Sequence, residues 1–430
     1  MENTIRLNVI RKAGLTFFML FAFSAFISKA AVNIFSGAAL FFSLLDIWVN
    51  GTYKELLKNR LFLALILPLL LGLALSLFSD AGLDGPAFFL SRYRFFFMVL
   101  PFMAFVREKK HLYILFFVLS LSGCLAVVYG FIQAHLTDSA FDFEGLLIVG
   151  RNSDLLASLS LMNTVLLFEL DVKDKSLRFF VRIGLLISLG LSIAAILVIR
   201  QRGAMLGLYM GWMVYALFFN RKFLVGLIVL SCVSVLVVKK DNPLATRIKS
   251  IVDLKTDPSN LTRLHLFSTG LVYVIEEHLV FGTGDKNSEE DFTPFFNSKG
   301  KSFKEKYAHA MDHPGNFHNS FLQIAAEGGA VFLAAYLAGI LYVLCIMVVK
   351  LQDTEARTFC IGTIIGTAGA FVMYFFHGEL YRYGGIVFYV VLMSGCLQKR
   401  QVEEKMGLKM ELSQIKPTLY GSQGPISPSL

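Results

Sequence analysis

The sequence has 430 residues, of which 56% are hydrophobic and 17% charged, and its formal net charge is +9. With a mean hydropathy of +0.64, this composition is too apolar for a water-soluble globular protein of this length. It excludes an ordinary soluble enzyme and predicts an all-α integral membrane protein.

Apolar runs recur along the chain, each close to the about 20 residues that a helix needs to cross a bilayer. They predict helices over residues 13–27, 31–49, 61–78, 88–106, 112–134, 155–170, 179–199, 203–219, 223–238, 330–349, 359–376 and 384–397. The first run has the length of a signal peptide, but the runs that follow make it the first helix of a multi-pass protein. About twelve transmembrane helices are therefore expected, nine within residues 1–238 and three within residues 318–397.

Lysine and arginine are distributed unequally between the short connections. If the N-terminus is cytoplasmic, far more of them lie in the cytoplasmic connections than in the outer ones. The positive-inside rule therefore predicts that both termini are cytoplasmic and that the long loop, residues 239–317, is on the outer face. This distribution also accounts for the positive net charge, so no nucleic-acid partner is expected.

The C-terminal tail and the cysteines carry no functional motif. Residues 398–430 are charged and then polar, which is typical of a disordered cytoplasmic tail. All five cysteines lie in apolar runs and none lies in the outer loop. They are therefore interpreted as small buried hydrophobic residues, not as disulfides or metal ligands.

The outer loop is predicted to be a structured unit with short helices. Asp257-Pro258-Ser259-Asn260 is a helix-start pattern. Apolar residues follow it at helical spacing: Leu261, Leu264, Leu271, Val274 and Ile275. These residues predict an amphipathic helix that can lie on the membrane face, closed by a turn at Gly282-Thr283-Gly284-Asp285.

Several arginines lie on the predicted outer side. Arg263 is expected in the first turn of the loop helix, where a cation opposes the helix dipole unless an anion docks at the helix N-terminus. Arg200 and Arg202 lie in a tight connection between two spans, either as interfacial anchors or as an anion-binding pair. Arg92 lies near the outer end of another span, and Arg151 precedes a further one. For Arg263, a solvated surface arginine is the alternative.

The histidines at the end of the loop do not have the spacing of a metal site. His309 and His313 are four residues apart, but Pro314-Gly315 breaks the register before His318. Asp312 is the nearby carboxylate, and no known metal-ligand motif is present. No metal is therefore expected.

A helix is expected to begin next to His318, with Asn316, Asn319 or Ser320 as its cap. Glu327 is nine residues after His318. In a regular helix the two side chains would lie on opposite faces and about 13 Å apart along the axis. Glu327 is therefore expected to be a structural or acceptor-side residue and not to orient His318.

These motifs resemble those of the bacterial O-antigen ligase family. Residues 201–204, Gln-Arg-Gly-Ala, are similar to its Ser-Arg-Gly-Ala motif. The resemblance continues in Arg263 and in His-Asn-Ser-Phe-Leu-x-x-x-x-Glu-x-Gly at residues 318–329. The motif order and the long loop before the last three spans agree over nearly the whole chain. Gln201 departs from the usual Ser, and residues 264–267, Leu-His-Leu-Phe, stand where an aromatic residue, often Trp, is common.

The resemblance implies a GT-C-like fold and a metal-independent, inverting glycosyltransferase without a cofactor. Such an enzyme takes glycan from undecaprenyl pyrophosphate and transfers it to a sugar hydroxyl of lipid A–core. It lies in the bacterial inner membrane among membrane lipids, with its active site on the periplasmic face. A monomer is expected.

The resemblance also implies roles for particular residues. His318 is the expected base, and Arg202 and Arg263 are the expected catalytic arginines that bind pyrophosphate together with Arg200. Further donor or acceptor contacts are expected from His313, Asn319, Arg92, Arg151 and Glu327.

Two other functions remain open. An O-antigen polymerase or a protein O-oligosaccharyltransferase of the same superfamily would use similar chemistry with another acceptor. A lipid or polysaccharide transporter would place polar or helix-breaking residues near the bilayer midplane. Here the polar groups gather at the outer rim, which favours an enzyme.

Overall fold

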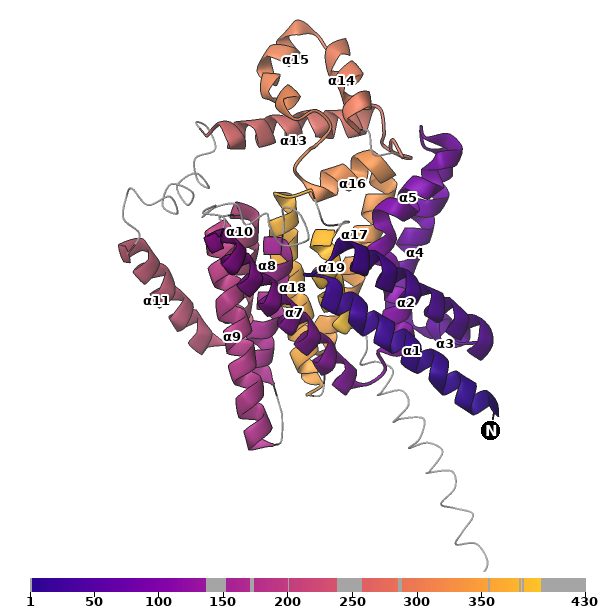
Figure 1. Ribbon diagram of the computed structural model, residues 1–430. Coiled ribbons are helices and arrows are strands. Elements are labelled where there is room, and N and C mark those ends of the chain that lie inside the picture. Colours follow the sequence, from indigo (N-terminus) through magenta and orange to yellow (C-terminus); the bar gives the residue numbers. More distant parts are fainter. Residues whose placement is uncertain are drawn as a thin grey trace, which may run out of the picture.

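The computed structural model describes residues 2–136, 152–170, 174–199, 201–237, 257–284, 288–354, 356–378, 380 and 383–395. Every regular element within these ranges is a helix. A body of apolar helices carries a smaller unit, α13 to α15, at one end, and the N-terminus lies toward the opposite end (Figure 1). We call the end of the body next to α13 the loop end. Arg151, Arg200 and the predicted tail lie outside the described residues.

The helices of the body come from the chain on both sides of the loop unit. They are α1 (Glu2–Ser24), α2 (Lys29–Asn50), α3 (Tyr53–Lys58), α4 (Arg60–Leu75), α5 (Gly85–Tyr93), α6 (Val99–Phe105), α7 (Lys109–Leu136), α8 (Asn152–Glu169), α9 (Lys175–Ile199), α10 (Arg202–Phe218), α11 (Arg221–Val237), α16 (Ser320–Gly328), α17 (Ala330–Val349), α18 (Arg357–Phe375) and α19 (Ile386–Ser394). The loop unit holds α13 (Pro258–Glu276), α14 (Ser288–Ser298) and α15 (Lys301–Lys306). Each predicted apolar run therefore contains helix.

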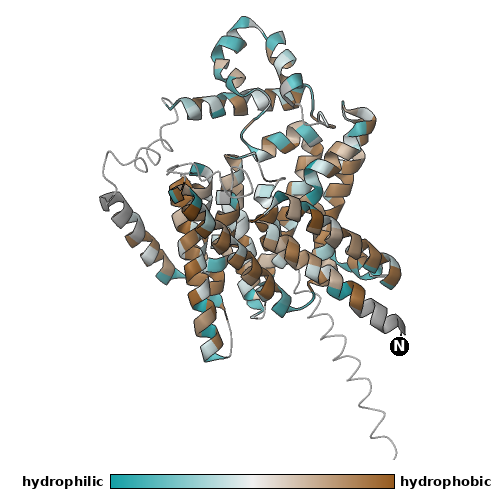
Figure 2. Ribbon diagram, viewed as in Figure 1, coloured by the Kyte–Doolittle hydropathy of each residue, from teal (hydrophilic) through white to brown (hydrophobic). Residues whose placement is uncertain are grey.

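Seven helical stretches in the described part of the chain are long and apolar enough to cross a membrane. They are Lys29–Asn50, Arg60–Phe78, Gly82–Phe105, Lys109–Leu136, Lys175–Ile199, Ala330–Gln352 and Arg357–Phe375. Figure 2 shows hydrophobic residues throughout the body and more hydrophilic ones in the loop unit. The protein is therefore a multi-pass, all-helical membrane protein, while the total of about twelve spans stays a prediction.

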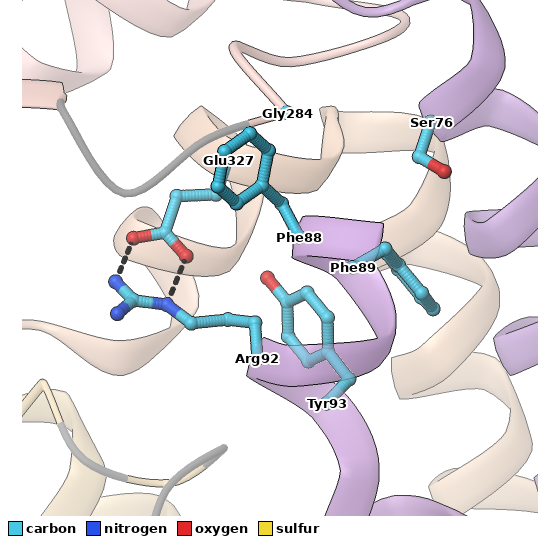
Figure 3. A pocket seen from close by; sticks show the side chains of 7 residues that line it. All are labelled: Ser76, Phe88, Phe89, Arg92, Tyr93, Gly284 and Glu327. Atoms are coloured by element: carbon cyan, nitrogen blue, oxygen red, sulfur yellow. Dashed lines mark hydrogen bonds and ion pairs between the residues drawn. The ribbon is translucent and has the colours of Figure 1, made fainter. Parts of the chain in front are cut away.

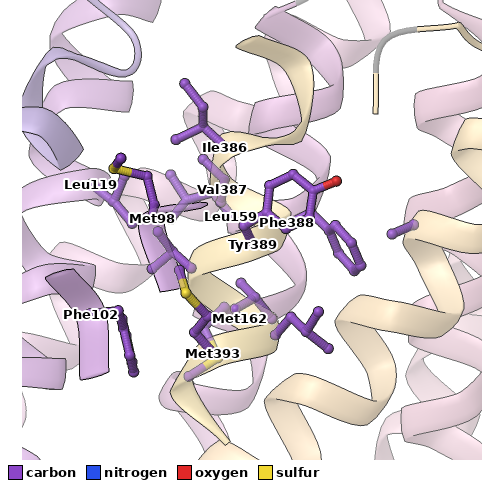
Figure 4. Packing of buried hydrophobic residues seen from close by; sticks show 14 of the residues in the cluster. Met98, Phe102, Leu119, Leu159, Met162, Ile386, Val387, Phe388, Tyr389 and Met393 are labelled. Atoms are coloured by element: carbon purple, nitrogen blue, oxygen red, sulfur yellow. The ribbon is translucent and has the colours of Figure 1, made fainter. Parts of the chain in front are cut away.

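The last helix, α19, lies in the centre of the body. All of its residues are buried, as expected of a helix that is hydrophobic on every side. Figure 4 shows Phe388 and Met393 of this helix packed among Met98, Leu159 and Met162. This core joins the N-terminal helices to the C-terminal ones.

A row of glycines lets α10 approach α18 closely. Gly203, Gly207 and Gly211 are four residues apart and share one face of α10. A Cβ on Gly207 would lie 2.6 Å from the carbonyl oxygen of Gly369 in α18, and one on Gly211 would lie 3.0 Å from that of Ile365. Such small-residue faces allow membrane helices to pack backbone against backbone. The beginning of α10 is thereby held beside the end of α18.

The first helices are joined around a buried carboxylate. Asp46 of α2 is fully buried. Its Oδ1 accepts a hydrogen bond from Arg11 Nε of α1 at 3.0 Å, and its Oδ2 accepts one from Thr52 Oγ1 at 2.7 Å. Asp46 comes shortly before α3 in the sequence. Figure 1 shows α3 on the far side of the body from α13.

The loop unit has its own hydrophobic core. This core is formed by side chains of α13, α14, η5 (Ala308–Asp312), the turn before α16 and α16 itself: Leu266, Tyr273, Val274, Phe292, Phe295, Phe296, Ala310, Phe317, Leu322, Ala325 and Ala326. The unit is therefore packed onto α16 and is not a linker. The predicted helix start is confirmed, because Asp257 Oδ1 accepts the N–H of Asn260 at 3.0 Å as the cap of α13.

One detail of the predicted loop helix was wrong: it ends at Glu276, before the glycine turn. Three residues of its apolar stripe, Leu264, Leu271 and Ile275, are 53%, 45% and 56% exposed. The helix packs against the protein with the face that carries Tyr273, because the aromatic rings of α14 and the turn before α16 lie on that side. That the exposed stripe lies on the membrane face stays a prediction.

Replacing Gly207 by Ala should destabilise the protein, because the added Cβ would meet the Gly369 carbonyl oxygen at 2.6 Å. Gly190→Ala on α9 is the matched control, since a Cβ there meets nothing within 4 Å. In helix interiors Ala is more favourable than Gly by about 0.8–1 kcal/mol, so the control should be neutral or slightly stabilising. The thermal unfolding midpoint in detergent should fall for Gly207→Ala only. Equal midpoints for the two variants would contradict the close packing of α10 on α18.

Candidate functional site

Four helix ends meet at the loop end of the body. They are the beginnings of α10, α13 and α16 and the end of α18. Arg202 joins α10 to α13, because its side chain bonds to Asn260. Ser320 joins α16 to the segment after α18, because its hydroxyl donates to the carbonyl oxygen of His377. Residues that are far apart in the sequence are thus brought together here.

Arg202 is the first residue of α10 and reaches the start of the loop helix. Its Nη1 donates to Asn260 Oδ1 at 2.9 Å, and its Nη2 lies 3.3 Å from Asp257 Oδ2. The side chain is only 10% exposed. Burial alone would raise the pKa of Asp257, but hydrogen bonds from the Asn260 backbone and the Arg202 guanidinium outweigh it and hold that pKa below its ordinary value. Asp257 therefore stays ionised against Arg202.

Arg263 lies one turn further along the same face of α13. It follows Asn260 by three residues, a spacing that places side chains next to each other on a helix. The prediction that Arg263 is in the first turn was wrong, because the helix begins at Pro258. Arg263 is in the second turn, where its charge opposes the helix dipole less strongly. The start of α13 therefore has Arg202 beside it and carries Arg263 one turn on.

His318 has a strained backbone. Its φ is +48°, and it is the one non-glycine residue with a positive φ in the described part of the chain. Such a conformation is uncommon for residues with a side chain and is often found at functional sites. The His318 N–H donates to Asn316 Oδ1 at 3.3 Å, and its ring lies edge-on to that of His313, with centroids 5.6 Å apart. The geometry holds the imidazole at a defined place before α16.

Asn319 caps α16. Its Oδ1 accepts the N–H of Leu322 at 2.9 Å, and the side chain is buried. Asn319 is thus the cap among the three residues considered from the sequence. It ends the turn that carries His318.

Glu327 forms a buried ion pair with Arg92 of α5. Arg92 Nε donates to Glu327 Oε2 at 2.8 Å, a second guanidinium nitrogen contacts Oε1, and the side chains are 11% and 3% exposed. Figure 3 shows this pair beside a small cavity that Phe88 and Tyr93 also line. The Glu327 carboxylate also accepts from Gln323, whose own oxygen accepts the N–H of Phe317 at 3.2 Å. Glu327 therefore supports the turn before His318 through Gln323.

Residues 282–284 form a strap across the end of α16. The Thr283 N–H donates to the Ala326 carbonyl and the Gly284 N–H to the Glu327 carbonyl, both at 2.9 Å. These bonds satisfy carbonyls that a helix end leaves without a partner. Gly282 has a φ of +70°, and a Cβ there would lie 2.5 Å from the Glu327 carbonyl oxygen. Glycine is therefore required at position 282, where the strap approaches the backbone of α16.

The structure also contains a buried pair that the sequence analysis missed. His377 Nδ1 lies 3.0 and 3.1 Å from the two carboxylate oxygens of Asp154. The side chains of Asp154 and His377 are 0% and 5% exposed. Both residues flank predicted spans, Asp154 just before residues 155–170 and His377 just after residues 359–376. Ionisable residues at such positions are functional candidates, and that was the available signal.

The described residues contain no group of three or more His, Cys, Asp or Glu side chains arranged to hold a metal ion. His309 lies 3.2 Å from Asp312 through its Nδ1, and Thr262 donates to the same carboxylate at 3.1 Å. Asp312 is therefore a structural partner of His309.

Residues 187–337 match a family model described as O-Antigen ligase. The matched range contains Arg202, Arg263 and His318. The resemblance stated from the motifs is thereby confirmed, and the match supports a glycosyltransferase-like enzyme of the O-antigen ligase and polymerase superfamily. A comparison with curated proteins gave no match.

Removing Arg92 should lower stability by about 3–5 kcal/mol, because it leaves the buried Glu327 carboxylate without its cation. Arg92→Ala and Glu327→Ala should each lower the thermal midpoint, and the double variant should lose less than the sum of the single losses. Lys110→Ala is the control, since its ion pair with Glu108 is exposed and should contribute little. Strictly additive losses would show that the buried pair is not coupled.

Proposed function

We propose that the protein, which carries an O-antigen ligase domain, transfers glycan from undecaprenyl pyrophosphate to a sugar hydroxyl of lipid A–core. The observation that carries the proposal is the placement of Arg202 on the start of α13, one turn before Arg263. Two guanidinium groups within the first two turns of one helix suit a pyrophosphate, which is a large anion. The matched family range contains both arginines and His318.

The donor side needs charge stabilisation more than proton transfer. The sugar of a lipid-linked glycan is already activated, so negative charge develops on the pyrophosphate as the bond to the sugar breaks. Arg202 and Arg263 donate to the developing charge, each charge-assisted hydrogen bond being worth about 1.5–3 kcal/mol. Arg200, outside the described residues, is proposed as a further phosphate contact. No metal or other cofactor is proposed.

Asp257 competes with the donor for Arg202. Its carboxylate lies 3.3 Å from Arg202 Nη2, so pyrophosphate must share or displace this contact. Asp257 also caps α13. Its carboxylate therefore shapes the helix start while it weakens the attraction for an anion.

The acceptor side needs a base. A sugar hydroxyl is a weak nucleophile, and an imidazole titrates close to neutral pH when it is unperturbed. We assign proton removal to His318, a role that typically contributes about 10²–10⁴-fold in rate. An inverting displacement requires the attacking hydroxyl and the leaving pyrophosphate on opposite faces of the sugar. His313, through its ring contact with His318, is proposed to contact the acceptor.

Three of the remaining candidate contact residues have partners within the protein, and the fourth lies outside the described residues. Asn319 is occupied as the cap of α16, and Arg92 and Glu327 are occupied with each other. These three residues are proposed to shape the acceptor side through the backbone that they hold. Arg151, outside the described residues, stays a proposed contact to donor or acceptor.

The proposed location follows from charge and substrate. The loop end would face the periplasm and both termini the cytoplasm of a bacterial inner membrane, as the positive-inside rule predicts. The lipid tails of donor and acceptor would stay in the bilayer while their head groups meet at the loop end. The proposed site is complete within one chain, so a monomer is sufficient.

Reconstitution tests the function directly. The purified protein in lipid vesicles should transfer glycan from an undecaprenyl-pyrophosphate donor to lipid A–core, also with EDTA present. The product is measured by its retarded migration on a gel. Elongation of the lipid-linked glycan instead would indicate a polymerase, and transfer to a peptide hydroxyl would indicate a protein O-oligosaccharyltransferase. A strict need for a divalent ion would contradict the metal-free mechanism.

His318→Ala should lower the rate of transfer by about 10²–10⁴-fold because the acceptor loses its base. The matched control is His309→Ala, an exposed loop histidine that pairs with Asp312; its rate should stay near that of the unaltered protein. Rates of folded protein are compared in the vesicle assay. Activity of His318→Ala within a few-fold of normal would remove His318 as the base.

Asp257→Asn should lower the KM for the donor, because it removes the carboxylate that competes for Arg202. Asn caps helices about as well as Asp, so α13 should remain intact. Arg202→Lys is the complementary variant and should reduce activity, since a lysine lacks the planar fork of a guanidinium. Donor KM and kcat are measured for both. An unchanged KM in the first variant together with full activity in the second would contradict phosphate binding at Arg202.

A further inference from the structure

The Asp154–His377 pair is built with a defined orientation. Nδ1 of His377 lies 3.0 and 3.1 Å from the two Asp154 oxygens. A hydrogen bond between these atoms sets the plane of the imidazole ring. Asp154 lies in the first turn of α8, and His377 follows the end of α18. The pair thus joins α8 to the segment after α18, and its two residues are 223 positions apart in the sequence.

The ring of His377 lies directly on the beginning of α10. A Cβ placed on Gly203 would be 2.7 Å from His377 Cε1 and 2.9 Å from Nε2. No side chain can therefore be added at this position unless the ring moves. Gly203 is the residue after Arg202, so the place of the ring and the place of the arginine backbone depend on each other. This contact explains why the residue between Arg and Ala in the Arg-Gly-Ala motif is a glycine.

The backbone of His377 holds the beginning of α16. The Ser320 hydroxyl donates to the His377 carbonyl oxygen and accepts the N–H of Leu380 at 3.1 Å. Ser320 is fully buried and follows His318 by two residues. One residue, His377, therefore contacts the Arg202 turn through its ring and the His318 turn through its carbonyl.

We propose that the buried Asp154–His377 pair is a positioning element that sets Arg202 and His318 relative to each other for glycan transfer. This inference rests on the functions proposed above for those two residues. His377 is buried, so it acts through these contacts and does not touch the substrate. A displacement of about 1 Å at a reacting centre can lower a rate about 10²-fold. The pair holds both turns against such a displacement.

The test compares variants of two equally buried aspartates. Asp154→Asn keeps an oxygen that accepts from His377 and should retain kcat within a few-fold. Asp154→Ala removes the partner of His377, and its kcat should fall about 10²-fold while the donor KM changes little. Asp46→Ala is the matched control, because Asp46 is also fully buried and ion-paired but lies among α1 to α3. It should lower the thermal midpoint without lowering the kcat of the folded protein.

A second variant covers the case in which Asp154→Ala does not fold. Ser320→Ala removes only the hydroxyl between α16 and His377, and it should lower kcat while His318 remains present. Normal kcat in folded Asp154→Ala or, failing that, in Ser320→Ala would reduce the pair to a stabilising role and overturn the proposal. Asp154→Asn as inactive as Asp154→Ala, with an altered pH profile, would also overturn it, because the pair would then handle a proton.

Hydrogen exchange provides a readout without substrate. Asp154→Ala should raise amide exchange at residues 318–322 and at residues 201–205. Ser320→Ala, used in its place, should raise exchange at residues 318–322. Asp154→Asn and Asp46→Ala should raise exchange at neither segment. If the unaltered protein transfers no glycan to lipid A–core, the proposed function fails, and exchange still decides whether the pair positions the two turns. Unchanged exchange at both segments would contradict the positioning role itself.

Discussion

The close packing of α10 against α18 is the constraint on which the loop end depends. Between membrane helices there is little hydrophobic driving force, because lipid tails are as apolar as the side chains they would replace. The helices are held instead by close backbone approach and by buried polar contacts. The glycine row of α10 provides the first, with Gly207 against the backbone of Gly369. Because α10 begins at Arg202, this packing also decides where the arginine lies.

Buried polar pairs supply the second kind of restraint at defined places. Arg92–Glu327 joins α5 to α16, Asp154–His377 joins α8 to the segment after α18, and Arg11–Asp46 joins α1 to α2. Burying such charges has a large desolvation cost, so these pairs are poor devices for stability alone. Their strength is orientation, because each removes the freedom of two helices to slide or rotate. Two of the three pairs support turns that carry the proposed catalytic groups.

Much of the local structure could be predicted from the sequence, because it depends on neighbours. Apolar runs of span length became helices, and Asp257 and Asn319 became caps. Contacts between distant residues could not be predicted, since no local pattern relates Arg92 to Glu327 across 235 residues. The face of α13 that packs against the protein could not be predicted for the same reason, because aromatic partners elsewhere in the chain decide which face is covered. His377 was missed because an isolated histidine after a span has no motif, although its partner Asp154 marks it once the helices are packed.

The proposed function gives the loop end a site that adds a finished glycan to lipid A–core. Its most direct test is the lipopolysaccharide gel pattern of a bacterial strain from which this gene alone has been deleted. The proposed function predicts lipid A–core without attached glycan, and recovery of the full pattern when the gene is returned. Lipid A–core capped by a single repeat unit, as expected for a missing polymerase, or an unchanged pattern would contradict it.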